Sequence, residues 1–209
     1  MSNPFIVYGR PGSGSLVVQI ALEELGVGYE RIWVGRESAE VERFRSISPT
    51  GKVPALRLPD GTVMFESAAM LIHLGTLDAS AQLAPQPGTS RHAIFLQWMT
   101  FLSANAYEAA LRFFYAPRYS SRGDADAAAI AAQAKIDYEA HLALIGNVLD
   151  PYVLGANYTL ADAYLYMLAS WLPEPRGLLA RVPALAAHAK KVSERAAVKK
   201  VDADHAKHA

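Results

Sequence analysis

Hydrophobic residues in the first part of the chain form short runs separated by turn-forming residues. Residues 5–8 are an apolar run of strand length, residues 29–34 are expected to form a second strand, and residues 16–25 repeat their apolar positions at helical spacing before Gly26. The loop at 9–15 is rich in Gly, Pro and Ser, which favour turns. The pattern predicts a strand, a helix and a second strand, followed by a helical or irregular stretch.

A β-hairpin is predicted next. Residues 52–56 and 62–65 are strand-like and flank Pro59-Asp60-Gly61, which is strong turn chemistry. Pro54 has no N–H to donate to a sheet, so it should mark the start or edge of the first of these strands, and a cis bond is one form such a junction takes.

Glu66 and Ser67 stand where the hairpin gives way to a helix. Ser67 is expected to cap this helix and Gly75 to close it. The free N–H groups and the dipole at a helix start favour a ligand carboxylate, and the backbone beside Pro54 can pair with a peptide-like ligand. The alternative is that Ser67 only caps the helix and Glu66 is only solvated.

The pattern changes after residue 78. Residues 79–88 carry two prolines and no helical pattern, which predicts a linker. Apolar positions beyond the linker predict only helices, over the segments 90–116, 124–149, 159–171 and 184–192. Thr159 and Asp162 form a capping-box variant, with Asp in place of Glu, at the start of the third segment.

This order predicts an α/β thioredoxin-like domain (βαβ-ββα) over residues 1–78, a linker over 79–88 and an all-helical domain over 89–209. Asp162 is expected to lie at a buried helix start. The tail that follows residue 192 carries Lys and His and is expected to be solvated.

Composition narrows the chemistry. The chain has 20 Lys and Arg against 20 Asp and Glu, so nothing favours nucleic acid or a membrane surface as a partner. No transmembrane run or signal peptide is indicated, and a soluble cytoplasmic protein is expected. Cysteine is absent, which excludes disulfides, thiolate metal sites and thiol nucleophiles. His205 and His208 have no third ligand in view, so no metal site is expected.

Residues 46–74 resemble the glutathione-binding half of the cytosolic glutathione S-transferases. The motif is Ser-Pro-x-Gly-Lys-Val-Pro-Ala-Leu, an Asp-Gly turn, and then Glu-Ser-x-Ala-Met-x-x-His-Leu. The resemblance implies that Pro54 is a cis-proline and that Val53 offers its backbone to the cysteinyl part of glutathione. It also implies that Ser67 holds the γ-glutamyl carboxylate, that Glu66 faces the ammonium group, and that Lys52 belongs to the same site. The helical second half resembles this family as well.

A transferase of this kind must make the glutathione thiolate available near pH 7. Lowering a thiol pKa of ~8.5 by ~1.5 units takes roughly 2 kcal/mol, and one hydrogen bond to a charged acceptor supplies roughly 1.5–3 kcal/mol. One hydroxyl at a helix start is therefore enough to lower the thiol pKa by this amount. The thiol must be that of glutathione, because the chain contains no cysteine.

Three hydroxyls compete for this role. Ser13 in Pro11-Gly12-Ser13 resembles the serine of the Ser-type transferases, which is the preferred assignment. An alignment on the bacterial Cys-type loop puts the cysteine on Gly14 and matches Ser15 to the neighbouring serine. Tyr8 stands where Tyr-type members place their catalytic tyrosine. The alternatives are that Ser15 is an ordinary N-cap and Tyr8 a packed strand residue.

A second set of residues would hold the other substrate, which should be apolar and electrophilic because a soft thiolate attacks it. Tyr107, Arg112 and Tyr115 cluster near the end of the predicted helix 90–116, where the family builds its acceptor pocket. Asn105 replaces a carboxylate that in the bacterial branch helps hold the glutathione ammonium across a dimer. The alternative is that these aromatic side chains belong to the core.

The resemblance thus predicts a dimeric glutathione S-transferase of the bacterial, Ser-type kind. It would use glutathione as co-substrate and conjugate it to small apolar electrophiles, as in detoxification. The alternative is a non-catalytic glutathione- or ligand-binding protein on the same scaffold. Only the placement of the activating hydroxyl separates these two functions.

Overall fold

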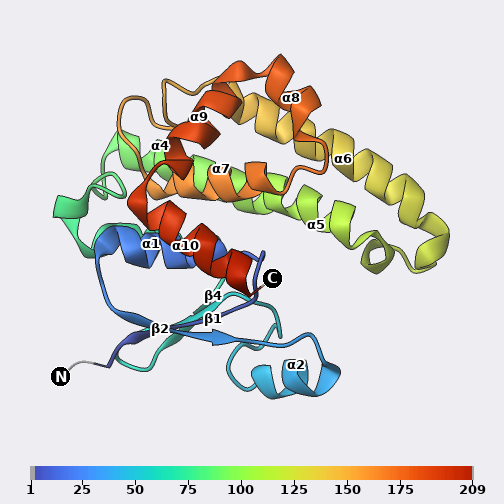
Figure 1. Ribbon diagram of the computed structural model, residues 1–209, viewed down its shortest axis with the longest axis horizontal. Helices are drawn as coiled ribbons and strands as arrows, with labels where there is room; N and C mark the ends of the chain where they lie inside the picture. Colours follow the sequence, from blue (N-terminus) through green and yellow to red (C-terminus); the bar gives the residue numbers. More distant parts are fainter. Residues whose placement is uncertain (1–2, 209) are drawn as a thin grey trace. The chain divides into compact units, whose positions relative to one another are not determined.

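The computed structural model describes residues 3–208 (Figure 1). The described residues form two compact units, one made of residues 3–87 together with 193–208, the other of Gly88–Val192. The predicted division differs at its C-terminal end, because residues 193–208 pack with the first unit and not with the helical second unit.

The first unit is built on a four-stranded mixed sheet in the order β2-β1-β3-β4. Its strands are β1 (Phe5–Gly9), β2 (Tyr29–Trp33), β3 (Ala55–Arg57) and β4 (Val63–Phe65). β1 runs parallel to β2 and antiparallel to β3, and β3 runs antiparallel to β4, with Leu56 paired to Val7 on one side and to Met64 on the other. The predicted thioredoxin-like α/β arrangement is confirmed.

The hairpin forms from its turn chemistry. The Asp60 carboxylate accepts a hydrogen bond from the Thr62 N–H at 2.8 Å, and Gly61 takes a positive φ of 92°, which a residue without Cβ adopts readily. The Val53–Pro54 bond is cis, and β3 begins directly after Pro54. The strand predicted at 52–56 is therefore shifted, as expected for a proline that cannot join the sheet ladder.

Three helices accompany the sheet in the sequence up to residue 77: α1 (Ser15–Leu25), α2 (Ser38–Phe44) and α3 (Ser67–Leu77). α1 ends at Gly26 in the left-handed conformation, as predicted. α3 does not end at Gly75. The helix continues to Leu77 because Leu71 and Leu74 are fully buried, and this packing outweighs a cost of ~1 kcal/mol for glycine inside a helix.

The tail is not solvated, which corrects the prediction for residues after 192. Residues Ala196–Lys207 form helix α10, which packs on α1 (Figure 1). Val198, Val201 and His205 are buried on the face it presents. This stripe is narrow and lies among Lys and Asp residues, so the mean hydropathy of the segment hides it.

The second unit is all-helical, as predicted. Thr159 and Asp162 form the predicted capping box at the start of α7, and the predicted helix 90–116 is interrupted by a π turn at Leu102–Tyr107. Pro175 is the first residue of α8 (Pro175–Arg181), because proline is tolerated in a first helical turn. The helices are α4 (Ser90–Phe101), α5 (Glu108–Phe114), α6 (Asp124–Gly146), α7 (Leu160–Ser170), α8 (Pro175–Arg181) and α9 (Pro183–Ser193), with a 3-10 turn at Ala116–Tyr119.

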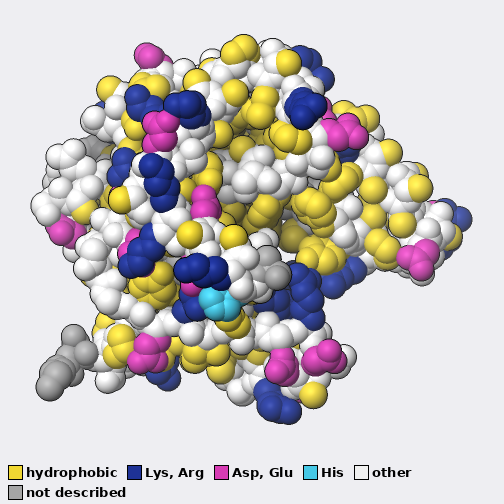
Figure 2. All heavy atoms as spheres, viewed as in Figure 1, with side chains coloured by type: hydrophobic (Ala, Val, Ile, Leu, Met, Phe, Trp, Pro, Cys, Tyr) yellow, Lys and Arg dark blue, Asp and Glu magenta, His cyan; other side chains and the backbone are white. Residues whose placement is uncertain are grey.

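Charges of both signs are interspersed on the face drawn in Figure 2, in line with the balanced composition. Within residues 3–208, no helix combines the length and the apolar character that crossing a membrane requires.

Candidate functional site

The loop between β1 and α1 brings Ser13 and Ser15 together. Their hydroxyl oxygens lie 3.0 Å apart, and both hydroxyls donate to the Arg10 carbonyl, Ser13 at 2.8 Å and Ser15 at 3.1 Å. The Ser13 oxygen also accepts from the N–H groups of Arg10 and Ser15, each at 3.3 Å. The two hydroxyls therefore form one hydrogen-bonded cluster at the start of α1.

The two serines differ in access to solvent. Ser15 is fully buried and is the first residue of α1, while Gly14 occupies the N-cap position, so Ser15 is not the ordinary cap. A Cβ at Gly9 would lie 2.3 Å from the Ser15 hydroxyl oxygen, so only glycine leaves room for Ser15 against β1. Ser13 keeps partial exposure. A ligand outside the loop meets Ser13 first.

Tyr8 packs inside the first unit. It is 6% exposed, and its ring lies 5.7 Å from that of Phe44. It belongs to a buried cluster with Ile6, Phe44 and Ala55. This packing fits the interpretation of Tyr8 as a core residue.

Glu66 and Ser67 form a special junction before α3. Glu66 has φ 74° and ψ 103°, a backbone conformation that residues with a side chain rarely adopt. Ser67, the predicted cap, is instead the first helical residue and is buried at 7% exposure. Glu66 occupies the N-cap position, and its side chain makes no capping hydrogen bond. Non-glycine residues with such strain cost of order 1–3 kcal/mol and cluster at ligand sites.

The remaining predicted glutathione residues of the first unit lie just before β3. Pro54 is buried, Val53 is partly buried, and Lys52 is exposed. The Lys52 N–H donates to the Thr50 hydroxyl at 3.2 Å, which shapes the approach to the cis bond.

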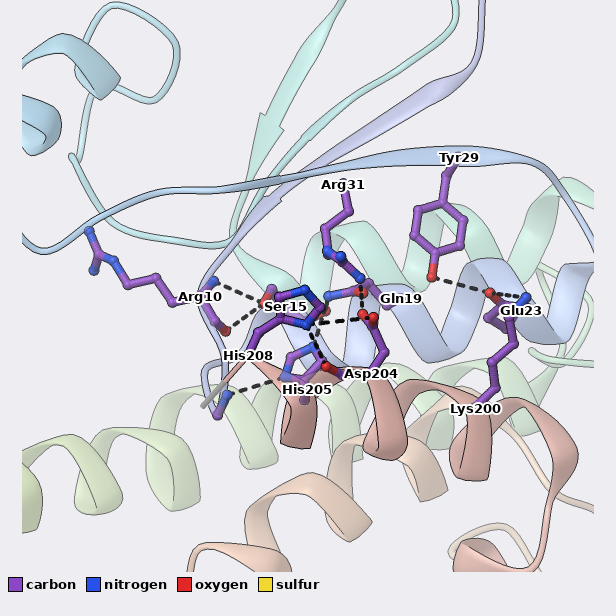
Figure 3. Close-up of polar contacts among 11 residues, drawn as sticks. Arg10, Ser15, Gln19, Glu23, Tyr29, Arg31, Lys200, Asp204, His205 and His208 are labelled. Atoms are coloured by element: carbon purple, nitrogen blue, oxygen red, sulfur yellow. Dashed lines mark hydrogen bonds and ion pairs between the residues drawn. The ribbon is translucent and has the colours of Figure 1, made fainter.

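Sequence reasoning missed a group of polar contacts between α10 and the start of the first unit (Figure 3). The His205 ring accepts from the Gly12 N–H at 3.2 Å and lies 2.8 Å from the Gln19 side-chain amide. Asp204 pairs with Arg31 of β2. The spacing of Val198, Val201 and His205 was the signal that could have revealed α10.

His205 should make folding stability depend on pH. Burial, followed by the charges of Arg31 and His208, lowers the pKa of His205 to about 4 from its ordinary 6.5. Between these values the unfolded chain binds a proton that the folded chain does not, so this contribution is complete above pH 6.5 and is lost as the pH falls toward about 4. We expect the melting temperature to fall as the pH is lowered from 6.5 toward about 4, and to fall by less in His205→Asn. Equal slopes of melting temperature against pH for the two proteins would contradict this role of His205.

The predicted residues of the second unit lie in or after the π turn. Asn105 is exposed within that turn, and Tyr107 ends it. The Tyr107 ring meets the Trp171 ring edge-on at 5.3 Å and lies 6.2 Å from that of Tyr164. Single π turns inside α-helices occur frequently at functional sites.

Arg112 is engaged with carboxylates of its own unit. Its guanidinium donates to Glu108 at 2.7 Å and to Asp137 at 3.1 Å, and Glu108 beside it raises the pKa of Arg112. Arg118, in contrast, lies over the Tyr115 ring at 4.3 Å and is exposed. Arg112 is therefore less suited than Arg118 to meeting an anionic ligand.

Residues 3–208 contain no group of three or more His, Asp or Glu side chains arranged to hold a metal ion. His205 faces Gln19 and Gly12, as described above.

Three comparisons place the chain among known proteins. The model for the N-terminal domain of glutathione S-transferases matches residues 15–77. The uncharacterized GST-like protein YncG of Escherichia coli strain K12 is 32% identical over 173 residues, which cover 80% of this chain and 82% of the relative. A glutathione transferase homologue from Sulfitobacter, solved with bound glutathione, superimposes with a TM-score of 0.87 at 28% identity, over 98% of this chain and 99% of that one.

Proposed function

Because this chain belongs to the glutathione S-transferase family, we propose that it binds glutathione in its first unit and conjugates it, through the thiolate sulfur, to a small apolar electrophile. The observation that carries the proposal is the junction of strained Glu66 with Ser67 at the first turn of α3. The solved Sulfitobacter homologue with bound glutathione supports glutathione as the ligand.

The chemistry of the junction suits the γ-glutamyl end of glutathione. The first N–H groups of α3 have no partner within the helix, and the helix dipole adds a partial positive charge there. Ser67 adds a hydroxyl at the same point, and the exposed Glu66 carboxylate adds the charge that an ammonium group needs. An amino acid carboxylate and its ammonium group thus each find a complementary group on neighbouring residues.

Ser13 is the residue we assign to activating the thiol. In this structure the Ser13 hydroxyl donates a hydrogen bond to the Arg10 carbonyl, and the buried Ser15 hydroxyl donates to the same carbonyl. When Ser13 rotates to donate to the thiolate, Ser15 keeps that carbonyl satisfied, so the rotation leaves no buried acceptor unpaired. Ser15 is then a supporting residue, and Tyr8 a core residue.

The second unit supplies the candidate residues for an electrophile. The rings of Tyr107 and Tyr115 are apolar and polarisable, and Arg118 over Tyr115 adds an exposed cation for a substrate that carries or develops negative charge. We keep Asn105 as a candidate for the glutathione ammonium and Arg112 as a residue that supports the α5 structure through Glu108 and Asp137.

Replacing Ser67 by alanine should weaken glutathione binding. A buried charged acceptor loses a hydrogen bond worth roughly 1–3 kcal/mol, which corresponds to a Kd about 5- to 150-fold higher by calorimetry. Ser46→Ala is the matched control, because the Ser46 hydroxyl is exposed and donates only to the Arg43 carbonyl at 2.8 Å. An unchanged Kd for Ser67→Ala would remove Ser67 from the site. Binding of glutathione without turnover of any aryl or alkyl halide would favour a binding protein.

A further inference from the structure

The loop that carries Ser13 is held at two points by residues outside it. At its start, the Arg10 side chain donates to the carbonyls of Val34 at 2.9 Å and Gly35 at 2.9 Å. At its middle, the Gly12 N–H donates to His205 Nδ1 at 3.2 Å, across 193 residues of sequence. The hydrogen bonds of Ser13 itself stay within the loop and α1.

The protonation of His205 follows from its surroundings. The ring is 4% exposed, and its lowered pKa keeps it neutral at neutral pH. A neutral ring that accepts at Nδ1 carries its proton on Nε2, which must then donate to Gln19 at 2.8 Å. Turning the Gln19 amide oxygen toward His205 lets Oε1, otherwise buried without a partner, accept this proton, in exchange for the long hydrogen bond from Gln19 Nε2 to the Ser15 carbonyl at 3.4 Å.

The helix that carries His205 is itself fixed to the first unit. Arg195 donates to Glu24 at 2.6 Å and Lys200 to Glu23 at 2.8 Å, so α10 is tied to α1 along its length. Trp33 of β2 packs edge-on against the His205 ring at 5.2 Å. His205 therefore has little freedom to follow the loop, and the loop must adapt to His205.

We propose that His205 is a positioning residue: by accepting the Gly12 N–H it holds the loop in the conformation that presents the Ser13 hydroxyl to the glutathione sulfur. Gly12 is exposed and has φ 65°, and its N–H belongs to the Pro11–Gly12 peptide, which His205 therefore holds from outside the loop. The next peptide is held from within the loop, because the Ser13 N–H donates to the Arg10 carbonyl at 3.2 Å. The role in catalysis rests on the proposed function, whereas the anchoring of the loop does not.

The anchoring is tested first, in the full-length protein without ligand. Nitrogen-15 NMR of His205 at pH 7 should show the Nε2–H form, and the Gly12 amide should exchange slowly with solvent. A Gly12 amide that exchanges as fast as an open loop, or an Nδ1–H form of His205, would overturn the proposal whatever the protein does with glutathione.

Two variants then separate anchoring from general packing. In His205→Asn the amide group lies where Nδ1 was and can still accept from Gly12, whereas in His205→Gln it lies one bond further out, near the Nε2 position. We expect His205→Asn to keep Gly12 protection and most of the activity. We expect His205→Gln to lose protection, to raise the pKa of bound glutathione, and to lower kcat by roughly tenfold with little change in glutathione Kd. Lys207→Gln, at the exposed last residue of the same helix, is the control.

The outcomes are distinguishable. Equal losses in both His205 variants, in step with melting temperature, would mean that His205 is only structural and would overturn the proposal. If the wild-type chain neither binds nor turns over glutathione, the proposed function fails, and the Gly12 exchange rates of the two variants still decide whether His205 anchors the loop.

Discussion

Replacing Asp162 by alanine should lower the free energy of unfolding by about 3–5 kcal/mol, and the melting temperature by on the order of 10 °C. The Asp162 carboxylate is fully buried and accepts from the N–H groups of Val153 at 2.8 Å and Thr159 at 2.7 Å, and from the Thr159 hydroxyl at 3.1 Å. His188, also buried, lies 3.0 Å from it. Removing this one group leaves several buried polar atoms without partners, so the cost exceeds that of a helix cap alone.

Denaturant unfolding followed by circular dichroism measures this effect. Asp124→Ala is the matched control, because Asp124 begins α6 as an exposed residue, and we expect a change within about 0.5 kcal/mol. The folded Asp162→Ala protein should bind glutathione with unchanged affinity. A large loss of affinity without a fall in melting temperature would show a role for Asp162 outside the core.

Replacing Ser13 by alanine should raise the pKa of the thiol of bound glutathione by about 1–2 units, equivalent to roughly 1.4–2.7 kcal/mol. The reason is that the thiolate loses a hydrogen-bond donor while the contacts at Glu66 and Ser67 remain. Titration of thiolate absorbance in the ultraviolet measures the shift. The rate with an activated aryl halide at neutral pH should fall about tenfold to a hundredfold, while the glutathione Kd stays nearly constant.

The comparison of hydroxyl variants makes this result specific. Ser15→Ala should give a smaller shift, because Ser15 is buried behind Ser13 and acts through the Arg10 carbonyl. Ser46→Ala should give none. A larger shift for Ser15→Ala or Tyr8→Phe would move the assignment to that residue and keep the mechanism. No shift in Ser13, Ser15 or Tyr8 variants would make this protein a binder.

Local sequence patterns predicted the parts of the site that local chemistry builds. Pro54 was expected at a strand start because proline cannot donate to a sheet, and β3 begins directly after it. The turn at Asp60 and Gly61 and the capping box at Thr159 and Asp162 depend on residues close in sequence, and both were predicted correctly. The assignments of Ser13, Ser67 and the acceptor residues stay predictions.

Other features depend on contacts that no local pattern contains. Gly75 reads as a helix end, but buried neighbours carry α3 past it. Arg112 was predicted to line the acceptor pocket beside aromatic residues, but two carboxylates engage it, one of them on α6. Asp162 is likewise paired with the buried His188, a contact distant in sequence that increases the expected destabilisation by Asp162→Ala.

The sequence by itself determined the fold class, the family, the absence of a protein thiol, and the short motifs whose residues act on their own backbone. The tertiary structure alone decided that α10 belongs to the first unit, that Ser15 is buried behind Ser13, and that His205 meets Gly12. The physical reason is range: turns and caps are set by hydrogen bonds over a few residues, whereas the burial of a half-polar helix such as α10 depends on the apolar surface that α1 and β2 offer it.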